Sequence, residues 1–155
     1  MLFHTFNANS KEYELWGIGA NYACQLMSNT HKPVITNLAT MATNGDDEKI
    51  IGNNFTLKTF VSQIKAMSSG AAYNYYLLIN GSVYSNGLGY IGQLASGNHE
   101  SQELPQPVRY KAAVSVPVVA QLVKAGYNFA FVYTVDRCLY ATGNNSQGQV
   151  SILDF

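Results

Sequence analysis

Short apolar runs separated by turn residues recur along this chain. Leu77–Ile79 and Val83–Tyr84 form two such runs, and Asn80–Gly81 lies between them. Asn-Gly is the dipeptide that most readily adopts the positive φ angles of a two-residue hairpin turn. The pattern therefore predicts a β-hairpin over residues 73–85, followed by a glycine-rich tail that ends at Gln93–Leu94.

The hairpin tail occurs three times. Residues 139–150 repeat residues 83–94 without a gap, so Gly143 lies 56 residues after Gly87. Residues 15–26 fit the same pattern, and Gly19 lies 68 residues before Gly87. Each copy has a large aromatic residue, then a glycine, then a glutamine: Trp16, Gly19 and Gln25; Tyr84, Gly87 and Gln93; Tyr140, Gly143 and Gln149. Two further glycines, Gly70 and Gly126, precede the later copies at the 56-residue spacing, and Gly81 lies in the central turn. Repeats of roughly 40–50 residues with strand–turn–strand content are typical of propeller blades.

The remaining pattern predicts an almost entirely β chain. Strands are expected at Glu12–Ile18, Phe55–Met67, Tyr73–Ile79, Ser82–Ser85, Val114–Ala125, Phe129–Val135 and Cys138–Thr142. A helical turn over Val118–Lys124 is the alternative, but β-branched residues and the following glycine favour a strand. Met1–Ser10 is expected to be a frayed lead-in and Ala95–Gln106 a loop between blades.

These elements predict an all-β fold, a partial β-propeller of four-stranded antiparallel blades. A single domain over residues 1–155 would hold a half-blade at about 12–35 and blades at about 55–108 and 114–150, with an irregular polar insertion at about 36–54. Such an arc has two open ends with unpaired strand edges and apolar faces. Three interpretations would account for the open ends. The first is that the chain is an N-terminal portion of a longer protein. The others are that the chain self-associates or that a partner covers the ends.

Composition narrows the function classes. The 155 residues hold nine basic and nine acidic side chains, and only 12% are charged, which argues against nucleic-acid and polybasic membrane binding. The start lacks the basic region and apolar run of a signal peptide, and no apolar run approaches the roughly 20 residues of a membrane span. We therefore expect an intracellular protein, cytoplasmic or nuclear.

Candidate chemistry is sparse. Gly87–Gly92 spells G-x-G-x-x-G, but a dinucleotide site needs that motif between a strand and a helix, and no helix is expected here. Cys24 and Cys138 have no metal-ligand spacing and no evident base, and His4, His31 and His99 are scattered in loops. The sequence thus predicts no enzyme activity, no cofactor and no metal site.

Three places are candidates for binding a protein partner. Asp46, Asp47 and Glu48 form an acidic run that either contacts a basic partner or is a solvated loop. Tyr90, at the corner of the central tail, is either an interface anchor or a residue packed between blades. His99 and Glu100 are adjacent and are either part of the same surface or a solvated turn. The recurring Gln25, Gln93 and Gln149 are expected to hydrogen-bond backbone between blades, which is a structural role.

These motifs resemble the regulator of chromosome condensation repeat family, whose blades carry a glycine, an alternating strand, a turn glycine, an aromatic residue and a W-G-x-N-x-x-G-Q-L-G tail. The resemblance covers roughly residues 13–150, including the prolines before Val108. The matching residues are Gly70, Asn80, Gly81, Tyr84, Gly87, Gly92, Gln93 and Leu94; Gly126, Tyr140, Gly143, Asn145, Gly148 and Gln149; and Trp16, Gly19, Asn21, Gln25 and Leu26.

The sequence also departs from the family pattern. Tyr73 and Phe129 replace the frequent histidine after the blade glycine, and Ile18, Asn86 and Thr142 replace the tryptophan before the tail glycine. Arg137 stands where a turn glycine is usual, and Cys24 where a tail glycine is usual. Family members resemble closed propellers of about seven blades.

The repeat itself and the absence of a catalytic constellation favour one function, and the resemblance implies an alternative. One is a non-catalytic scaffold that binds a protein partner through its blade loops. The alternative is a guanine-nucleotide exchange or regulatory factor for a small GTPase, or an accessory subunit of a large assembly. In each case the partner is a protein, the remaining propeller blades or a second copy.

Overall fold

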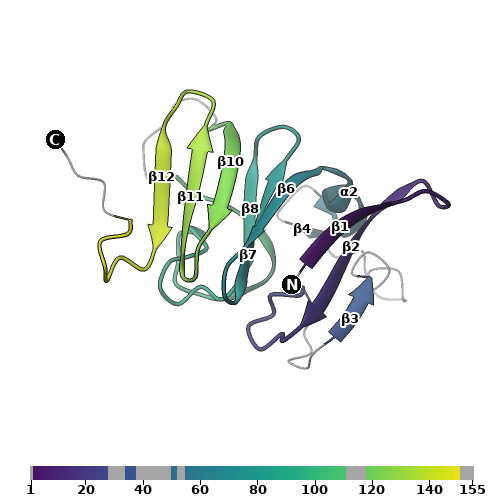
Figure 1. Cartoon of the computed structure of the whole chain (residues 1–155), viewed down its shortest axis with the longest axis horizontal. Coiled ribbons are helices and arrows are strands. Elements are labelled where there is room, and N and C mark those ends of the chain that lie inside the picture. Colours follow the sequence, from purple (N-terminus) through teal and green to yellow (C-terminus); the bar gives the residue numbers. More distant parts are fainter. Residues whose placement is uncertain (1, 28–33, 38–49, 52–54, 111–117, 151–155) are drawn as a thin grey trace.

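The computed structural model of the chain describes residues 2–27, 34–37, 50–51, 55–110 and 118–150. Three antiparallel sheets stand side by side in a row, from the first strands of the chain to the last (Figure 1). Each sheet is one blade of a partial propeller, and a small two-stranded ladder and one short helix lie beside the first two blades.

The central blade has four strands in the order β6 (Ile64–Ser69), β7 (Tyr73–Leu78), β8 (Val83–Gly87) and β9 (Gln102–Pro107). The predicted hairpin is confirmed as β7 and β8, which pair from Leu77 opposite Val83 to Tyr73 opposite Gly87. In its turn Gly81 has φ +83°, and the Asn80 side-chain oxygen accepts a hydrogen bond from the Ser82 amide. The turn therefore forms through the local chemistry that its sequence predicts.

The last blade has three described strands, β10 (Ala120–Ala125), β11 (Phe129–Thr134) and β12 (Leu139–Gly143). The pairing of Phe129 with Gly143 repeats that of Tyr73 with Gly87, so the 56-residue spacing of the sequence is also a spacing of structure. The helical alternative for 118–124 is wrong, because β10 pairs along β11. Arg137 adopts φ +68° at the turn position that Gly81 occupies in the central blade.

The first blade contains two strands, β1 (Leu2–Asn7) and β3 (Val34–Asn37), that the sequence reading missed. β1 pairs with β2 (Glu12–Gly19) along its whole length, and β2 pairs with β3. The expected frayed lead-in is therefore wrong. Leu2 is buried against the next blade, and this apolar contact and the ladder to β2 hold the segment in place.

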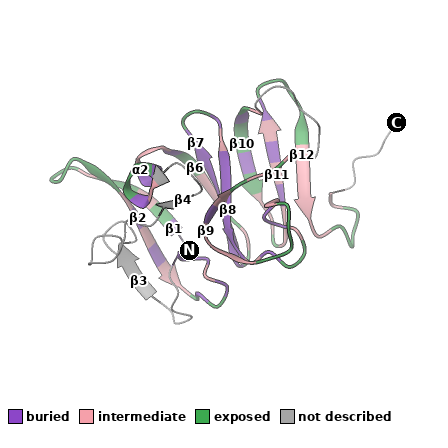
Figure 2. Ribbon diagram, turned by 180° about the vertical axis from the view of Figure 1, so that it is seen from behind, coloured by how far each residue is buried: buried purple, intermediate pink, exposed green. Residues whose placement is uncertain are grey.

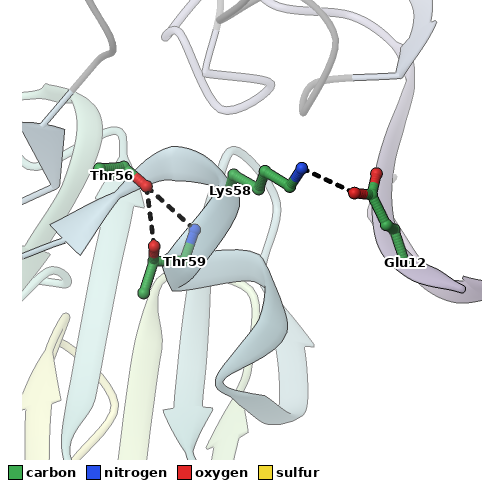
Figure 3. A network of polar contacts seen from close by, with 4 residues as sticks. All are labelled: Glu12, Thr56, Lys58 and Thr59. Atoms are coloured by element: carbon green, nitrogen blue, oxygen red, sulfur yellow. Dashed lines mark hydrogen bonds and ion pairs between the residues drawn. The ribbon is translucent and has the colours of Figure 1, made fainter.

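The expected strand over Phe55–Met67 is also wrong in its middle. β4 (Ile50–Ile51) pairs with β5 (Phe55–Thr56), after which the chain forms helix α2 (Leu57–Ser62) before β6 begins. The Thr56 hydroxyl caps the helix by accepting a hydrogen bond from the Thr59 amide at 3.1 Å (Figure 3). Apolar residues at helical spacing, Leu57, Phe60 and Val61, bury the inner face of this helix.

The segment that was expected to be a loop over 95–106 contains β9. Its prolines, Pro105 and Pro107, occupy the outermost strand of the central sheet, where a missing amide donor is tolerated. Pro107 lies opposite Tyr84, and Pro105 falls in the shift of register between Ser85 and Gly87.

Two hydrophobic clusters join the three blades. The first lies between the first and central blades and includes Leu2, Leu15, Phe60 and Tyr76, and the second lies between the central and last blades. Figure 2 shows the consequence: β7 and β8 are buried along their length, whereas β12 is partly or fully exposed. Burial alternates along β11, which is the pattern of a sheet with one covered face.

Candidate functional site

Each glycine-rich tail is closed by its own glutamine. The side-chain oxygens of Gln25, Gln93 and Gln149 accept hydrogen bonds from the backbone amides two residues earlier, at 2.9, 3.0 and 2.8 Å. The expectation that these glutamines bond backbone is confirmed, but the expectation that they bridge blades is wrong. They shape a loop within one copy, and a similar loop therefore recurs at the end of each blade.

The first glycine of each tail has a backbone conformation that favours glycine, and in the later two tails the space is also closed. Gly19, Gly87 and Gly143 have φ values of 108°, 106° and 101°. A Cβ on Gly87 would lie 2.4 Å from the Ala72 carbonyl oxygen, and one on Gly143 would lie 2.4 Å from the Asn128 carbonyl oxygen. Side chains at Gly87 and Gly143 would therefore both strain the backbone and collide with the preceding turn.

The residues at the tryptophan position of the repeat link neighbouring blades. The Asn86 amide group donates to the Cys24 carbonyl oxygen at 3.2 Å, and the Thr142 hydroxyl donates to the Gly92 carbonyl oxygen at 2.7 Å. Cys24 and Gly92 are themselves equivalent, so the same bond occurs at two successive boundaries. Asn86 and Thr142, which replace the tryptophan of the family pattern, thus join neighbouring blades through hydrogen bonds.

Gly70 and Gly126 hold a second boundary contact. A Cβ on Gly70 would lie 2.6 Å from the Gly126 carbonyl oxygen, so the two turns touch through backbone. The Tyr73 hydroxyl donates to the carbonyl oxygens of Gly126 and Phe129 across the same boundary. Burial raises the pKa of Tyr73 well above its ordinary value, which keeps the hydroxyl protonated as a donor.

The recurring aromatic residues contact neighbouring side chains. The Trp16 ring nitrogen donates to a carboxylate oxygen of Glu14 at 3.0 Å. The Tyr84 ring meets Phe60 edge-on at 5.2 Å between centroids, and the Tyr140 ring meets Tyr110 at 4.8 Å. Such edge-to-face contacts are the arrangement that aromatic pairs prefer.

Tyrosines are exposed at one end of the arc, which we call the tail end. It comprises the loops after β2, β8 and β12 and the turns between β6 and β7 and between β10 and β11 (Figure 1). Tyr90 is 67% exposed on the central tail, so the structure places it at the surface and not between blades. Tyr22 is 60% exposed at the equivalent position of the first tail, and Tyr127 is 76% exposed on the turn before β11. The sequence reading missed Tyr22, although it lies 68 residues before Tyr90 in the same repeat frame.

The other predicted partner residues fall into two groups. His99 and Glu100 are exposed, and a ring nitrogen of His99 lies 3.2 Å from the Tyr90 carbonyl oxygen, so the structure brings His99 and Tyr90 together. Asp46, Asp47 and Glu48 lie outside the described residues.

The glycine motif of the central tail lies in a loop and not at the start of a helix. Gly87–Gly92 runs from a strand into the tail loop, and no helix follows it within residues 88–110. A Cβ on Gly89 would lie 2.0 Å from the Glu100 carbonyl oxygen, so close chain approach accounts for that glycine. No three His, Cys, Asp or Glu side chains in the described ranges lie close enough to hold a metal ion. No helix among these residues has the length and hydrophobicity to cross a membrane.

The surroundings of the Cys138 thiol disfavour its action as a nucleophile. The negative charge of Asp136 raises the pKa of this exposed cysteine above its ordinary value, so less thiolate is present near neutral pH. The Thr134 hydroxyl, in turn, donates to Asp136 and lowers the pKa of that carboxyl.

Comparison with known sequences identifies the repeat. The profile described as "Regulator of chromosome condensation (RCC1) repeat" matches residues 80–133, and a second profile of the same description matches residues 119–149. These segments cover the β7–β8 turn, the central tail and the last blade. No curated protein matches the chain at a significant level.

Solved structures share the fold. Prp20p from Saccharomyces cerevisiae superimposes with a TM-score of 0.61 and 19% identity, over 99% of this chain and 31% of that protein. Human WBSCR16 and yeast RCC1 (Prp20) bound to Kap60 each give 0.58, with 18% and 19% identity, over 85% and 91% of this chain. The chain spans 29% and 28% of those two proteins, so it corresponds to less than a third of each relative.

The sequence matches, the repeated blade geometry and the fold agree. Residues 80–149 therefore carry regulator of chromosome condensation (RCC1) repeats, and the chain forms part of a propeller.

Proposed function

We propose that this chain is a non-catalytic scaffold that binds a protein partner at the tail end of its blades. The observation that supports the proposal is the exposure of Tyr22, Tyr90 and Tyr127, one from each blade. Hydrogen bonds tie the loops together: the Ala71 amide donates to the Tyr127 carbonyl oxygen at 3.0 Å, and the Leu88 amide donates to the Ala72 carbonyl oxygen at 2.8 Å. Tyrosines on a rigid frame lose little entropy on binding and are enriched among residues that dominate interface energies.

His99 and Glu100 extend this surface beside Tyr90, and the acidic run Asp46–Glu48 stays a predicted contact for a basic partner. The zero formal charge favours a protein over a nucleic acid as partner. A cytoplasmic or nuclear location and the single-domain organisation, with the acidic insertion between the first and central blades, also stay predictions.

The alternative function is regulation of a small GTPase, or service as an accessory subunit of a large assembly. The reported binding of Prp20p to Gsp1p and histones, and of yeast RCC1 to Kap60, supplies candidate partners. Exchange activity would be tested directly, by following release of labelled GDP from a purified small GTPase with and without the chain.

The scaffold proposal is tested by comparing two triplets of exposed positions. One variant carries Tyr22→Ser, Tyr90→Ser and Tyr127→Ser, and the control carries Ile79→Ser, Val119→Ser and Val135→Ser near the opposite, hairpin end, where the side chains are also exposed. Proteins crosslinked to the wild-type chain in cells would be identified by mass spectrometry, and candidates such as Gsp1p and histones would be measured in purified form.

We expect the tyrosine variant to bind its partner at least tenfold more weakly, which corresponds to about 1.4 kcal/mol, while the control binds as wild type does. Equal binding by the wild-type chain and the tyrosine variant would contradict the proposal. GDP release stimulated by the chain would support the alternative function.

A further inference from the structure

A groove of about 300 Å³ opens at the tail end, between the first and central blades. One wall is the first tail, which contributes Ala20, Tyr22 and Gln25, and the other is the turn that runs from Ser69 into β7. Asn74, which also lines the groove, joins the two blades, because its side-chain amide donates to the Gln25 carbonyl oxygen at 2.6 Å. The groove therefore lies on the surface of a blade boundary that is already closed.

The groove does not depend on how many blades the row contains. A blade of a propeller packs against its two neighbours, so a blade added before β1 or after β12 would contact the first or the last blade. The boundary between the first and central blades is filled by the first hydrophobic cluster and by the bond from Asn86 to the Cys24 carbonyl oxygen. Further blades would leave the tail-end side of this boundary uncovered, which favours a separate molecule as the occupant.

Gln25 supplies a hydrogen-bond donor to the groove. Its side chain is 8% exposed, and its side-chain oxygen accepts from the Ala23 amide at 2.9 Å, whereas its Nε2 group makes no hydrogen bond with the described residues. The equivalent Gln93 is fully buried, and its Nε2 group also has no partner in the described part of the chain. An unpaired amide donor at this depth costs free energy, which a bound acceptor would recover.

Small side chains form the two walls. Ala20 and Ala71 line the groove, and the residues at the equivalent positions of the next boundary are Leu88 and Tyr127. Because a methyl group projects less than a leucine or tyrosine side chain, the main chain of a partner can lie against these walls.

The charge of the groove narrows the occupant further. None of its described lining residues is acidic or basic, and an ionised side chain buried without a counter-charge is costly. A main-chain carbonyl oxygen is an uncharged acceptor that every residue supplies. Tyr22, which is 60% exposed and lines the groove, offers an aromatic ring to the apolar side chains beside such a carbonyl.

We propose that this groove binds an uncharged segment of a protein partner. The main chain of the segment lies between the alanine walls, and one of its carbonyl oxygens accepts a hydrogen bond from the Nε2 group of Gln25. An apolar side chain of the segment packs against Tyr22. Acidic and basic residues are excluded from the part of the segment that enters the groove.

This inference rests on the proposed scaffold function, because it places one contact of the partner at the tail end and gives that contact its chemistry. The two can fail separately. A variant with Ala20→Leu and Ala71→Tyr, which we call the groove-filled variant, leaves Tyr90 and Tyr127 unchanged. If it binds the crosslinked partner as wild type does while the tyrosine variant does not, the groove proposal is overturned and the scaffold proposal stands.

The test selects random dodecapeptides displayed on phage against the whole chain, with the groove-filled variant in solution as competitor. Both substituted positions are exposed and receive the residues that the next boundary carries, so we expect this variant to fold, and thermal melting would check it. We expect the selected peptides to share a run of uncharged residues. Fluorescence anisotropy should show saturable binding to wild type and at least tenfold weaker binding to the groove-filled variant, and amide NMR shifts should appear at Ala71 and Ala72.

Gln25→Glu tests the donor. This change keeps an oxygen that can accept from the Ala23 amide and removes the Nε2 group, so it should weaken binding of the selected peptides at least fivefold. Tyr90→Ser is the matched control, because Tyr90 is not among the described residues that line the groove, and it should bind the peptides as wild type does. The proposal is overturned if no peptide distinguishes wild type from the groove-filled variant, if the shared run is charged, or if the folded Gln25→Glu variant binds as wild type does.

Discussion

The hydroxyl of Tyr73 lies 2.5 Å from the backbone carbonyl oxygen of Phe129, and these residues occupy the same position in consecutive repeats. One blade thus bonds to its neighbour through the position where the family often has histidine. Phe129 has no hydroxyl, and its ring instead meets Phe131 edge-on at 5.6 Å. The equivalent position therefore carries a polar link in the central blade and an apolar contact in the last.

Tyr73→Phe should lower the free energy of unfolding by about 1–2 kcal/mol, because it removes the donor that the Gly126 and Phe129 carbonyl oxygens share. Urea denaturation followed by far-ultraviolet circular dichroism would measure the change. Tyr127→Phe is the control, since this ring is exposed, and it should cost under about 0.5 kcal/mol. Equal losses in the two variants would show that the Tyr73 hydroxyl does not join the blades.

Gly87→Ala and Gly148→Ala should differ sharply in stability. Both glycines have positive φ, but a Cβ on Gly87 would meet the Ala72 carbonyl oxygen, whereas one on Gly148 would meet nothing within 4 Å. The Gly148 change should cost about 1 kcal/mol of backbone strain, and the Gly87 change about 3 kcal/mol or more. Thermal and urea unfolding would compare them, and similar costs would rule out the steric explanation.

Thr56→Ala should cost more stability than Lys58→Ala, although both alter the polar contacts around α2 (Figure 3). Thr56 supplies the helix cap, which is worth about 1 kcal/mol. Lys58 lies 2.6 Å from Glu12, but both side chains are more than half exposed, so their ion pair should contribute under about 0.5 kcal/mol. Denaturant unfolding at low and high salt would separate the two contributions. A larger loss from Lys58→Ala would contradict this ranking.

His4 should make the fold sensitive to acid. Burial lowers the pKa of His4 below its ordinary value of 6.5, and a ring nitrogen lies 2.9 Å from the Val61 carbonyl oxygen on α2. The unfolded chain therefore binds this proton more readily than the folded one. The stabilisation is present above about pH 6.5 and is lost as the pH falls toward the lower folded pKa.

His4→Gln should reduce this pH dependence. The free energy of unfolding would be measured from pH 7.5 to pH 5 for both proteins, and the difference between them isolates His4 from other groups that titrate. We expect the wild-type chain to lose more stability over that interval. Parallel pH profiles would show that His4 is not responsible.

The sequence predicted the two late hairpins because their signals are local. In β7 and β8 the turn dipeptide, the apolar runs and the tail glycine all lie within one stretch of chain. The last blade follows from the same pattern at a fixed spacing, even though Arg137 replaces the turn glycine and adopts its positive φ.

The missed elements depend on distant partners or on short-range capping. β1 is stable because Leu2 packs against another blade, and β9 is a strand only because the edge of β8 is beside it. Six residues of α2 follow a threonine cap in a sequence that also fits a strand. Such tertiary effects are not visible in the pattern of a single segment.

The candidate site was predicted in part. Repeat alignment identified Tyr90, and the same alignment contains the signal for Tyr22, which differs only in belonging to a more divergent copy. Tyr127 could not be found this way, because its equivalent in the central blade is Ala71.

The closure of each tail by its own glutamine has a consequence for how such chains vary. Because the side chains of Gln25, Gln93 and Gln149 accept hydrogen bonds from amides two residues back, part of the shape of each tail is set within its own copy. The connection between blades can then vary in length, as the unequal spacings of 68 and 56 residues illustrate, while each glutamine keeps its hydrogen bond within the tail. Duplication of a blade would also duplicate the tail loop together with the glutamine that closes it. The number of blades and the exposed residues on their loops can therefore evolve separately.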